Sequence, residues 1–159
     1  MASSPDEVMF SASVRAEQAR RGSRKAQERR AALGRFHEEL SAEVIAFIGE
    51  RNSAYFATAS ADGQPYVQHR GGPAGFLRVL DERTIAFANY TGNRQYISLG
   101  NLAENEHAFL FLMDYAAAQR LKLWGRARVV SDDAGDTIVF TVLAWDWNCS
   151  QHIPKLVAP

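Results

Sequence analysis

The chain has 159 residues, of which 47% are hydrophobic, 11% aromatic and 23% charged, and its formal net charge is zero. This composition is typical of a globular domain and excludes disordered and low-complexity proteins, while the length excludes a TIM barrel or a large two-domain enzyme. The single cysteine, Cys149, excludes an intrachain disulfide and a zinc site built from cysteines. No charged leader precedes an apolar core and no apolar run reaches membrane-spanning length, so we expect a cytoplasmic protein without a membrane partner.

Charge is distributed unevenly along the chain. Residues 15–35 carry eight basic and two acidic side chains, whereas the residues that follow carry ten basic and fourteen acidic ones. Residues 13–33 are rich in Ala, Arg, Gln and Glu and predict one basic helix after a frayed lead over residues 1–12. We therefore divide the chain into this N-terminal lead and basic helix, 1–40, and a folded domain, 41–159. The basic face favours a solvated helix surface over contact with nucleic acid or another anionic surface, because the rest of the chain offers no broad basic field.

The remaining pattern is mainly that of strands. A helix is predicted to begin at Ser41, a good capping residue, and to end near Gly49. Asp62-Gly63 predicts a hairpin turn, and a helix over Gln95–Ala103 separates the fourth strand from the fifth. The predicted strands are Tyr55–Ser60, Gln64–Arg70, Gly75–Leu80, Thr84–Asn89, Ala108–Met113, Leu121–Val130 and Thr137–Trp145.

Two of these strands, Ala108–Met113 and Thr137–Trp145, are so apolar that we expect burial on both faces. Parallel βαβ units would need a helix between most strands, and only one is present. The sequence thus predicts a mainly β (α+β) fold, a six- to seven-stranded antiparallel barrel with flanking helices.

The common signatures of catalytic and nucleotide sites are absent from the sequence. It contains no GxGxxG after a strand, no GxxxxGK[ST] loop, no HExxH and no GxSxG motif. The four histidines lack metal-ligand spacing, so we expect no metal site. A Cys149–His152 nucleophile pair has no third orienting group, and an inert cysteine is the simpler interpretation. We therefore identify no catalytic residue.

Two polar segments at strand ends indicate an anion site. Gln68-His69-Arg70-Gly71-Gly72-Pro73 ends a strand with polar and cationic side chains, followed by glycines that let a ligand approach the backbone. The segment from Asn89 to Gln95 leaves a strand and begins a helix, whose free N–H groups favour an anion beside Asn93 and Arg94. Each segment alone also fits an ordinary strand end or capping turn. Together, in an antiparallel barrel, they can bring Arg70 and Arg94 to one phosphate.

A third segment, Trp145-Asp146-Trp147-Asn148-Cys149-Ser150-Gln151-His152, combines two tryptophans with amide and imidazole groups. These groups can stack on a flat heteroaromatic ligand and hydrogen-bond to it. They fit equally well the packing of a last strand against the core and its rim.

From about Tyr55 to His152 the chain resembles the pyridoxamine 5′-phosphate oxidase-like flavoproteins, the FMN-binding split β-barrels. The resemblance lies in Phe87–Arg94, continued by Asn101–Asn105, and in two segments, Tyr66–Leu77 and Trp145–His152, that are similar to a bacterial subgroup. It implies a split β-barrel that forms a homodimer and binds FMN at the interface. The chain lacks the C-terminal Arg and His motif of true pyridoxamine-phosphate oxidases, which argues against vitamin B6 oxidase activity.

The resemblance also implies which residues bind FMN and what the protein does. The phosphate would meet Arg70 and Arg94, with Asn93 and Gln95 nearby. The flavin and ribityl parts would be lined by Gln68, His69, Ala88 and Asn89, and the other subunit would supply Trp147, Gln151 and His152. The implied function is hydride transfer through FMN to or from a small organic substrate, with a nicotinamide or a deazaflavin as electron donor. The alternative is a flavin or haem carrier or sensor without turnover.

Overall fold

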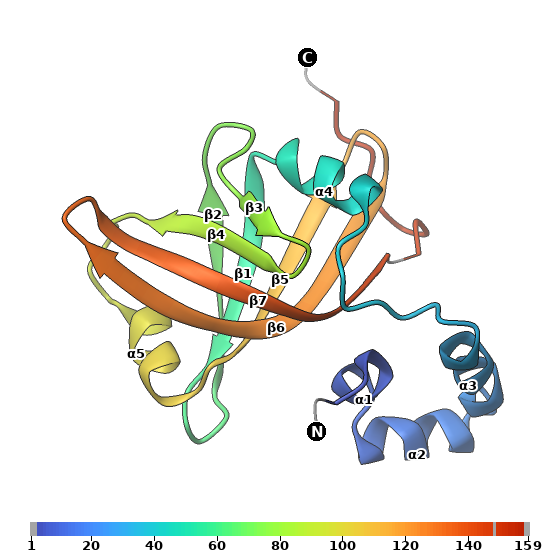
Figure 1. The fold of residues 1–159 in the computed structure, drawn as a ribbon. Helices are drawn as coiled ribbons and strands as arrows, with labels where there is room; N and C mark the ends of the chain where they lie inside the picture. Colours follow the sequence, from blue (N-terminus) through green and yellow to red (C-terminus); the bar gives the residue numbers. More distant parts are fainter. Residues whose placement is uncertain (1–2, 148, 158–159) are drawn as a thin grey trace.

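A computed structural model of the chain describes residues 3–147 and 149–157. Within these residues one antiparallel sheet is accompanied by helices at its ends and beside it (Figure 1). The helices are α1 (Pro5–Met9), α2 (Ala12–Arg20), α3 (Arg24–Ala32), α4 (Ala42–Gly49) and α5 (Ile97–Glu104). The strands are β1 (Ser53–Ala59), β2 (Pro65–Gly71), β3 (Arg78–Asp81), β4 (Thr84–Asn89), β5 (His107–Asp114), β6 (Gln119–Asp132) and β7 (Gly135–Trp147).

The sheet curls into a barrel that backbone hydrogen bonds do not close. Its strand order is β2-β1-β5-β6-β7-β4-β3, so β2 and β3 are the two edges. Within the described residues β3 pairs only with Thr84–Ala86, so the last residues of β4 also border the opening and face β2. One side-chain hydrogen bond crosses the opening, from Nη1 of Arg70 at the end of β2 to Oδ1 of Asn89 at the end of β4, at 2.7 Å. The predicted fold class, an antiparallel split β-barrel with flanking helices, is confirmed.

The inner face of the sheet forms the core. Alternate residues of the long strands, among them Phe56, Leu110, Leu123 and Phe140, are fully buried. Phe56 and Phe87 pack edge to face, with ring centroids 5.4 Å apart, and α4 closes one end of the barrel with its buried apolar face. Burial of each large apolar side chain stabilises the fold by about 1.5–3 kcal/mol. These contacts hold the strands that carry the candidate site.

Local signals in the sequence are confirmed at several boundaries. The Oγ of Ser41 accepts a hydrogen bond from the N–H of Val44 at 3.3 Å and caps α4. The turn between β1 and β2 contains Gly63 at φ +90°, as the Asp62-Gly63 pair predicts. The third predicted strand is wrong in its first half, because the N–H of Phe76 donates to the carbonyl of Pro73 in a turn and β3 begins only at Arg78.

The expectation that two strands are buried on both faces is wrong for the single chain. In β5, Leu110 and Leu112 are fully buried on the inner face, whereas Phe109 and Phe111 are only partly buried on the outer one. The reason is the two-residue period of a strand, which presents successive side chains to opposite sides of the barrel wall. β7 shows the same alternation over most of its length.

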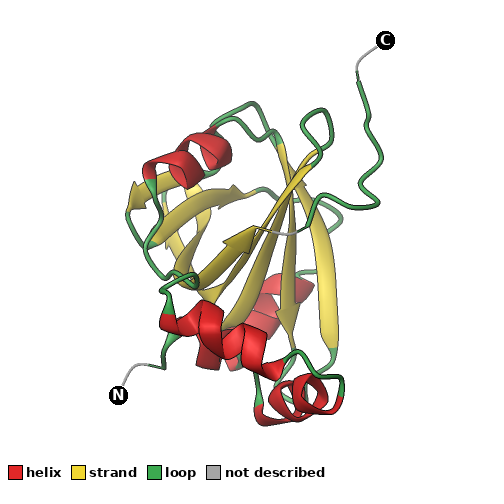
Figure 2. Cartoon of the chain, turned by 90° about the vertical axis from the view of Figure 1, so that its right-hand side faces the viewer, coloured by secondary structure: helices red, strands yellow, loops and turns green. Residues whose placement is uncertain are grey.

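The N-terminal region differs from the single basic helix predicted over 13–33. Gly22, at φ +81°, separates α2 from α3, and residues 5–9 of the expected frayed lead form α1, capped by Ser4 and Glu7. We call residues 3–35 the N-terminal arm; its three helices contain no buried residue and lie together beside the barrel (Figure 2). No helix among the described residues has the length and apolar character needed to cross a membrane.

Candidate functional site

A small polar pocket lies where β2 and β4 meet the start of α5. Its volume is about 40 Å³, which exceeds the space of one water molecule and suits a phosphate-sized group rather than a whole nucleotide. We call it the anion pocket. Its lining includes the side chains of Tyr66, Gln68, Arg70, Asn89, Asn93, Arg94 and Gln95. The structure therefore brings together six of the residues proposed from the sequence: Gln68, Arg70, Asn89, Asn93, Arg94 and Gln95.

Arg70 brings a positively charged guanidinium group to this pocket. Its Nη1 donates to Asn89, but its buried Nε has no hydrogen-bond partner among the described residues. Its guanidinium carbon lies 5.9 Å from the centroid of the Phe56 ring, and burial lowers the pKa of Arg70, an effect that Tyr66 opposes. A half-buried cation with a free donor is stabilised by an anion that accepts a charge-assisted hydrogen bond.

The turn before α5 supplies the second side of the pocket. Arg94 and Tyr96 have φ values of +60° and +52°, in the left-handed region that residues with side chains seldom occupy. Each such conformation costs on the order of 1–3 kcal/mol, and such costs cluster at ligand sites. Oδ1 of Asn93 accepts from the N–H of Gln95 at 3.2 Å, and no side chain of residues 3–147 or 149–157 caps the first turn of α5. The first N–H groups of the helix are thus available to an anion.

Three hydrogen bonds hold α5 and the residue that follows it against β1, β2 and the turn between these strands. Nδ2 of Asn101 donates to Oγ1 of Thr58 at 2.9 Å, and both side chains are buried. Oγ of Ser98 donates to Oε1 of Gln68 at 3.3 Å, and Asn105 donates to the carbonyl of Ser60. Sequence reasoning assigned no role to Ser98 or Tyr66; the signal for Tyr66 was its two-residue spacing from Gln68 along β2.

Two predicted residues, His69 and Ala88, project from the outer face of the wall. Both directly neighbour pocket residues in their strands, and strand alternation turns them to the other side. The His69 ring lies against Tyr55, with centroids 5.7 Å apart, and Ala88 is exposed. They flank the opening between β2 and β4 from outside rather than line the pocket.

The C-terminal residues lie far from the pocket in the same chain. His69, Tyr55, Phe111, Lys122 and Asp146 are in register across β2, β1, β5, β6 and β7, so four strand spacings of about 4.8 Å, roughly 19 Å around the wall, separate the β2 side of the pocket from the start of the tail. Trp147 packs edge-on against Phe47, and Gln151 and His152 are exposed. Asn148 of the same motif lies outside the described residues. One chain therefore does not bring the tail to its own anion pocket.

The described part of the chain contains no cluster of side chains that could hold a metal ion. No group of three or more His, Cys, Asp or Glu side chains is placed there to hold a metal ion. The polar groups of the anion pocket are cations, amides and hydroxyls. This set matches the oxygens of a phosphate.

Comparison with known proteins supports the same family as the sequence motifs. Residues 40–152 match the family model described as pyridoxamine 5′-phosphate oxidase. The fold is similar to that of HupZ from Group A Streptococcus, with a TM-score of 0.56 and 16% identity over 74% of this chain and 98% of that chain. It is also similar to a proposed pyridoxamine 5′-phosphate oxidase of Lactobacillus delbrueckii, with a TM-score of 0.56 and 20% identity over 69% of this chain and 95% of that chain.

A third similar structure is a Clostridium acetobutylicum protein related to general stress protein 26, with a TM-score of 0.53 and 14% identity over 72% of this chain and 89% of that chain. At these identities the likeness concerns the fold alone, and no curated protein sequence matches the chain. The family model, however, covers well over half of the residues. The chain belongs to the pyridoxamine 5′-phosphate oxidase family.

Proposed function

We propose that the protein is a homodimeric FMN-binding flavoprotein that transfers a hydride to or from a small organic substrate. The observation that carries the proposal is the half-buried Arg70, whose Nε lacks a partner among the described residues, in one pocket with Arg94 at the uncapped start of α5. Two guanidinium groups and free helix N–H groups form a phosphate site. FMN carries such a phosphate at one end.

The other predicted residues of β2 and β4 lie beside the opening of the barrel, where they can contact the part of FMN that extends beyond its phosphate. The pocket holds little more than a phosphate, so we assign the ribityl chain and flavin ring to the residues that flank the opening. Gln68 and Asn89 do so on the inner side, and His69 and Ala88 on the outer side. When bound, FMN supplies the hydride chemistry, and these residues would bind and orient it.

The outer face of the sheet supports the proposed homodimer. Tyr55 and Val67 are 37% and 59% exposed there, beside the partly buried Phe111 and Met113. An apolar patch of this kind is typical of a protein interface. In a symmetric dimer each partner would cover the patch of the other, and Trp147, Gln151 and His152 would reach the site of the other subunit.

A carrier that binds flavin or haem without turnover is the alternative function. No histidine occurs among the described residues of the anion pocket, and this favours a phosphate ligand over ligation of haem iron. Carrier and enzyme differ in one observable property. An enzyme-bound FMN is reduced by its electron donor and reoxidised by its substrate.

The first experiment is a visible absorption spectrum of the full-length protein after incubation with FMN and desalting. We expect oxidised-flavin bands at one FMN per chain and a mass twice that of the chain by light scattering. A Soret band would favour the haem carrier, and a colourless protein would contradict the proposal. Anaerobic addition of a reduced nicotinamide or a reduced deazaflavin then distinguishes the two functions, since bleaching by one of them is expected of an oxidoreductase only.

A further inference from the structure

A short turn follows β7 and lies beside Arg120 of β6. Within it the N–H of Ile153 donates to the carbonyl of Ser150 at 3.4 Å, and His152 has a φ value of +62°, in the left-handed region. We call residues 149–153 the C-terminal turn. It exposes the side chains of Gln151 and His152, which the proposed function assigns to the FMN site of the other subunit.

Arg120 connects the C-terminal turn to the barrel wall. Its Nη2 donates to the carbonyl oxygen of Cys149 and, at 3.4 Å, to that of Gln151. One guanidinium nitrogen thus holds two carbonyl groups that are two residues apart. A hydrogen bond from a charged donor is roughly twice as strong as one between neutral groups. This contact therefore fixes the backbone from which Gln151 and His152 project.

A second contact holds the chain just before the C-terminal turn. The carboxylate of Asp146, the last residue but one of β7, lies 3.8 Å from Nζ of Lys122 and 3.5 Å from Nη2 of Arg30 in α3. Lys122 and Arg120 alternate with buried residues along β6 and share its outer face. Two cations on one face of β6 thus hold the end of β7 and the turn that follows it.

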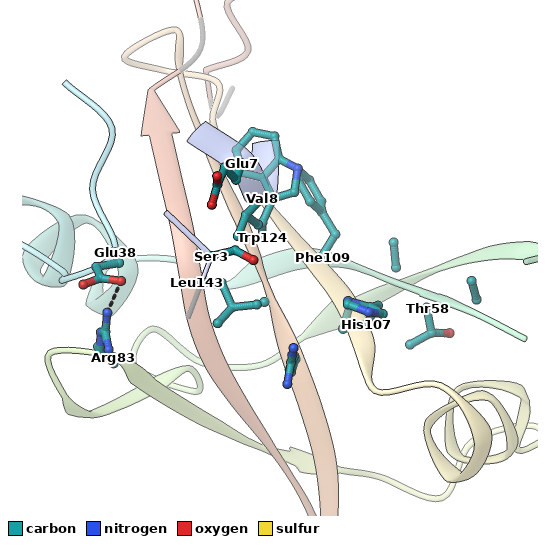
Figure 3. Close-up of a pocket in the computed structure, with 15 residues that line it drawn as sticks. Ser3, Glu7, Val8, Glu38, Thr58, Arg83, His107, Phe109, Trp124 and Leu143 are labelled. Atoms are coloured by element: carbon teal, nitrogen blue, oxygen red, sulfur yellow. Dashed lines mark ion pairs between the residues drawn. The ribbon is translucent and has the colours of Figure 1, made fainter. Parts of the chain in front are cut away.

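These contacts lie on the face of the sheet that the proposed homodimer covers. Arg120 pairs with Met113 of β5, a residue of the apolar patch assigned to the partner. Trp124 projects from the same face of β6 beside Phe109, as Figure 3 shows. Within one chain, β5 and β1 lie between the strand of Arg120 and β2, and Arg120 is not among the described residues that line the anion pocket. Arg120 and the C-terminal turn are therefore closer to the partner's side of the interface than to their own pocket.

We propose that Arg120 is a positioning residue for the FMN site of the partner subunit. It holds the C-terminal turn in the conformation that presents Gln151 and His152 to the flavin, and it acts through this turn rather than by contact with FMN. The inference rests on the proposed function, because it requires both FMN and a dimer. Sequence reasoning assigned no role to Arg120, which lies outside all three polar segments.

Titration of the full-length protein with FMN, followed by flavin fluorescence, measures the effect of Arg120. Arg120→Met keeps an apolar stem of similar length without the donors, and we expect the FMN dissociation constant to rise about tenfold. Arg120→Lys keeps one charged donor and should raise the constant less, and it tests the same contact if Arg120→Met does not fold. The matched control is Arg128→Met on the same face of β6. The Arg128 side chain is exposed and makes no hydrogen bond or ion pair with any described residue, so we expect the constant to stay unchanged.

The titration separates a failure of this inference from a failure of the proposed function. A parent protein that does not bind FMN would contradict the proposed function. A parent protein that binds FMN, together with Arg120 variants that bind it equally well, would overturn the inference alone. Equal weakening by Arg120→Met and Arg128→Met would overturn it too, because the loss would then come from the charge of β6 rather than from the contact with the C-terminal turn.

Mixed dimers test whether the C-terminal turn acts across the interface. Chains with Arg120→Met and chains with Arg70→Ala/Arg94→Ala are co-expressed with different affinity tags, and dimers that contain one chain of each kind are purified over both tags. If the turn serves the partner, one site of the mixed dimer combines the intact pocket of the first chain with the intact turn of the second. We therefore expect one FMN per mixed dimer to bind with the affinity of the parent protein.

A role of Arg120 within its own chain predicts the opposite result. Each pocket of the mixed dimer would then lack either its two arginines or the support of Arg120, so no FMN would bind as tightly as to the parent protein. A general loss of stability in the Arg120→Met chain would have the same consequence. Absence of a parent-like site in the mixed dimer would therefore overturn the inference.

Discussion

The barrel and the N-terminal arm are both regularly hydrogen-bonded, but only the barrel buries apolar side chains. Phe56, Leu110 and Leu123 are completely buried in the barrel, whereas α1, α2 and α3 contain no buried residue. Short helices are marginal in water without tertiary packing. The barrel therefore supplies most of the stability of the fold and all the described residues of the anion pocket, whereas the arm adds little to either.

The largest expected effect comes from a core substitution in the barrel. Phe56→Ala removes a ring that packs against Phe87, and we expect the free energy of unfolding in urea to fall by about 3–5 kcal/mol. Val14→Ala, in the arm, is expected to leave it almost unchanged. Similar losses for the two variants would show that the arm is as well packed as the barrel.

The next effect concerns FMN. Arg94→Ala removes a charge-assisted hydrogen bond, and we expect the binding free energy of FMN, measured by fluorescence titration, to weaken by on the order of 1.5–3 kcal/mol. Arg29→Ala removes the same charge from α3 in the arm and should leave the FMN dissociation constant unchanged. An unaltered constant for Arg94→Ala would refute its assignment to the phosphate.

Two glycines test how closely the barrel wall is packed, because one is surrounded by other atoms and the other has open space around it. A Cβ on Gly125, in β6, would lie 2.3 Å from the carbonyl oxygen of Thr141 and 2.5 Å from Cζ of Phe140. We expect Gly125→Ala to lower the melting temperature, at a cost of about 1–3 kcal/mol. Gly100 in α5 has open space around its Cβ position, so Gly100→Ala should stabilise the helix by about 0.5–1 kcal/mol. Equal melting temperatures would contradict the close packing of the wall.

The smallest effect is electrostatic and depends on pH. The N–H of Ala117, and then Arg51 at 2.9 Å, hold the pKa of Asp114 below its ordinary value. Because the folded pKa is below the unfolded one, the carboxylate stabilises the fold above about pH 4, and this contribution is lost as the pH falls through the folded pKa. Asp114→Asn should therefore unfold at lower urea concentration at pH 7 and at the same concentration as the parent protein near pH 2.

A control for this pH dependence lies in the arm. Arg20 and Arg21 lower the pKa of Glu17, but these side chains are exposed to solvent, so Glu17→Gln should not change unfolding by urea. A difference for Asp114→Asn that stays constant from pH 7 to pH 2 would show that the side chain acts through its shape rather than its charge.

Local sequence signals predicted the barrel well because they depend on neighbouring residues. The bounds of Thr84–Asn89, the cap at Ser41 and the turn at Gly63 follow from alternation, hydrogen bonding and backbone conformation over a few positions. Gly22 is a signal of the same local kind: its φ of +81° ends α2, whereas the helix-forming composition on both sides of it predicts one continuous helix.

Contacts between residues far apart in the chain and the division of the site across the barrel wall had no such local signal. Val8 and Leu143 line one cavity although more than 130 residues separate them in the chain. Likewise, the alternation of side chains along β2 places His69 and Arg70 on opposite faces of the strand. Which of the two faces lines the pocket becomes clear only from the folded barrel, where the ends of β2 and β4 face each other. The assignment of Trp147 depends on a second subunit and stays a prediction.

Arg70 and Arg94 are proposed to hold the phosphate of FMN, and the most direct test is to compare FMN with riboflavin, which lacks the phosphate. We predict that the protein binds FMN at least tenfold more tightly than riboflavin, and that the double variant Arg70→Ala/Arg94→Ala binds the two with similar affinity. A parent protein without this preference, or a double variant that retains it, would contradict the claim.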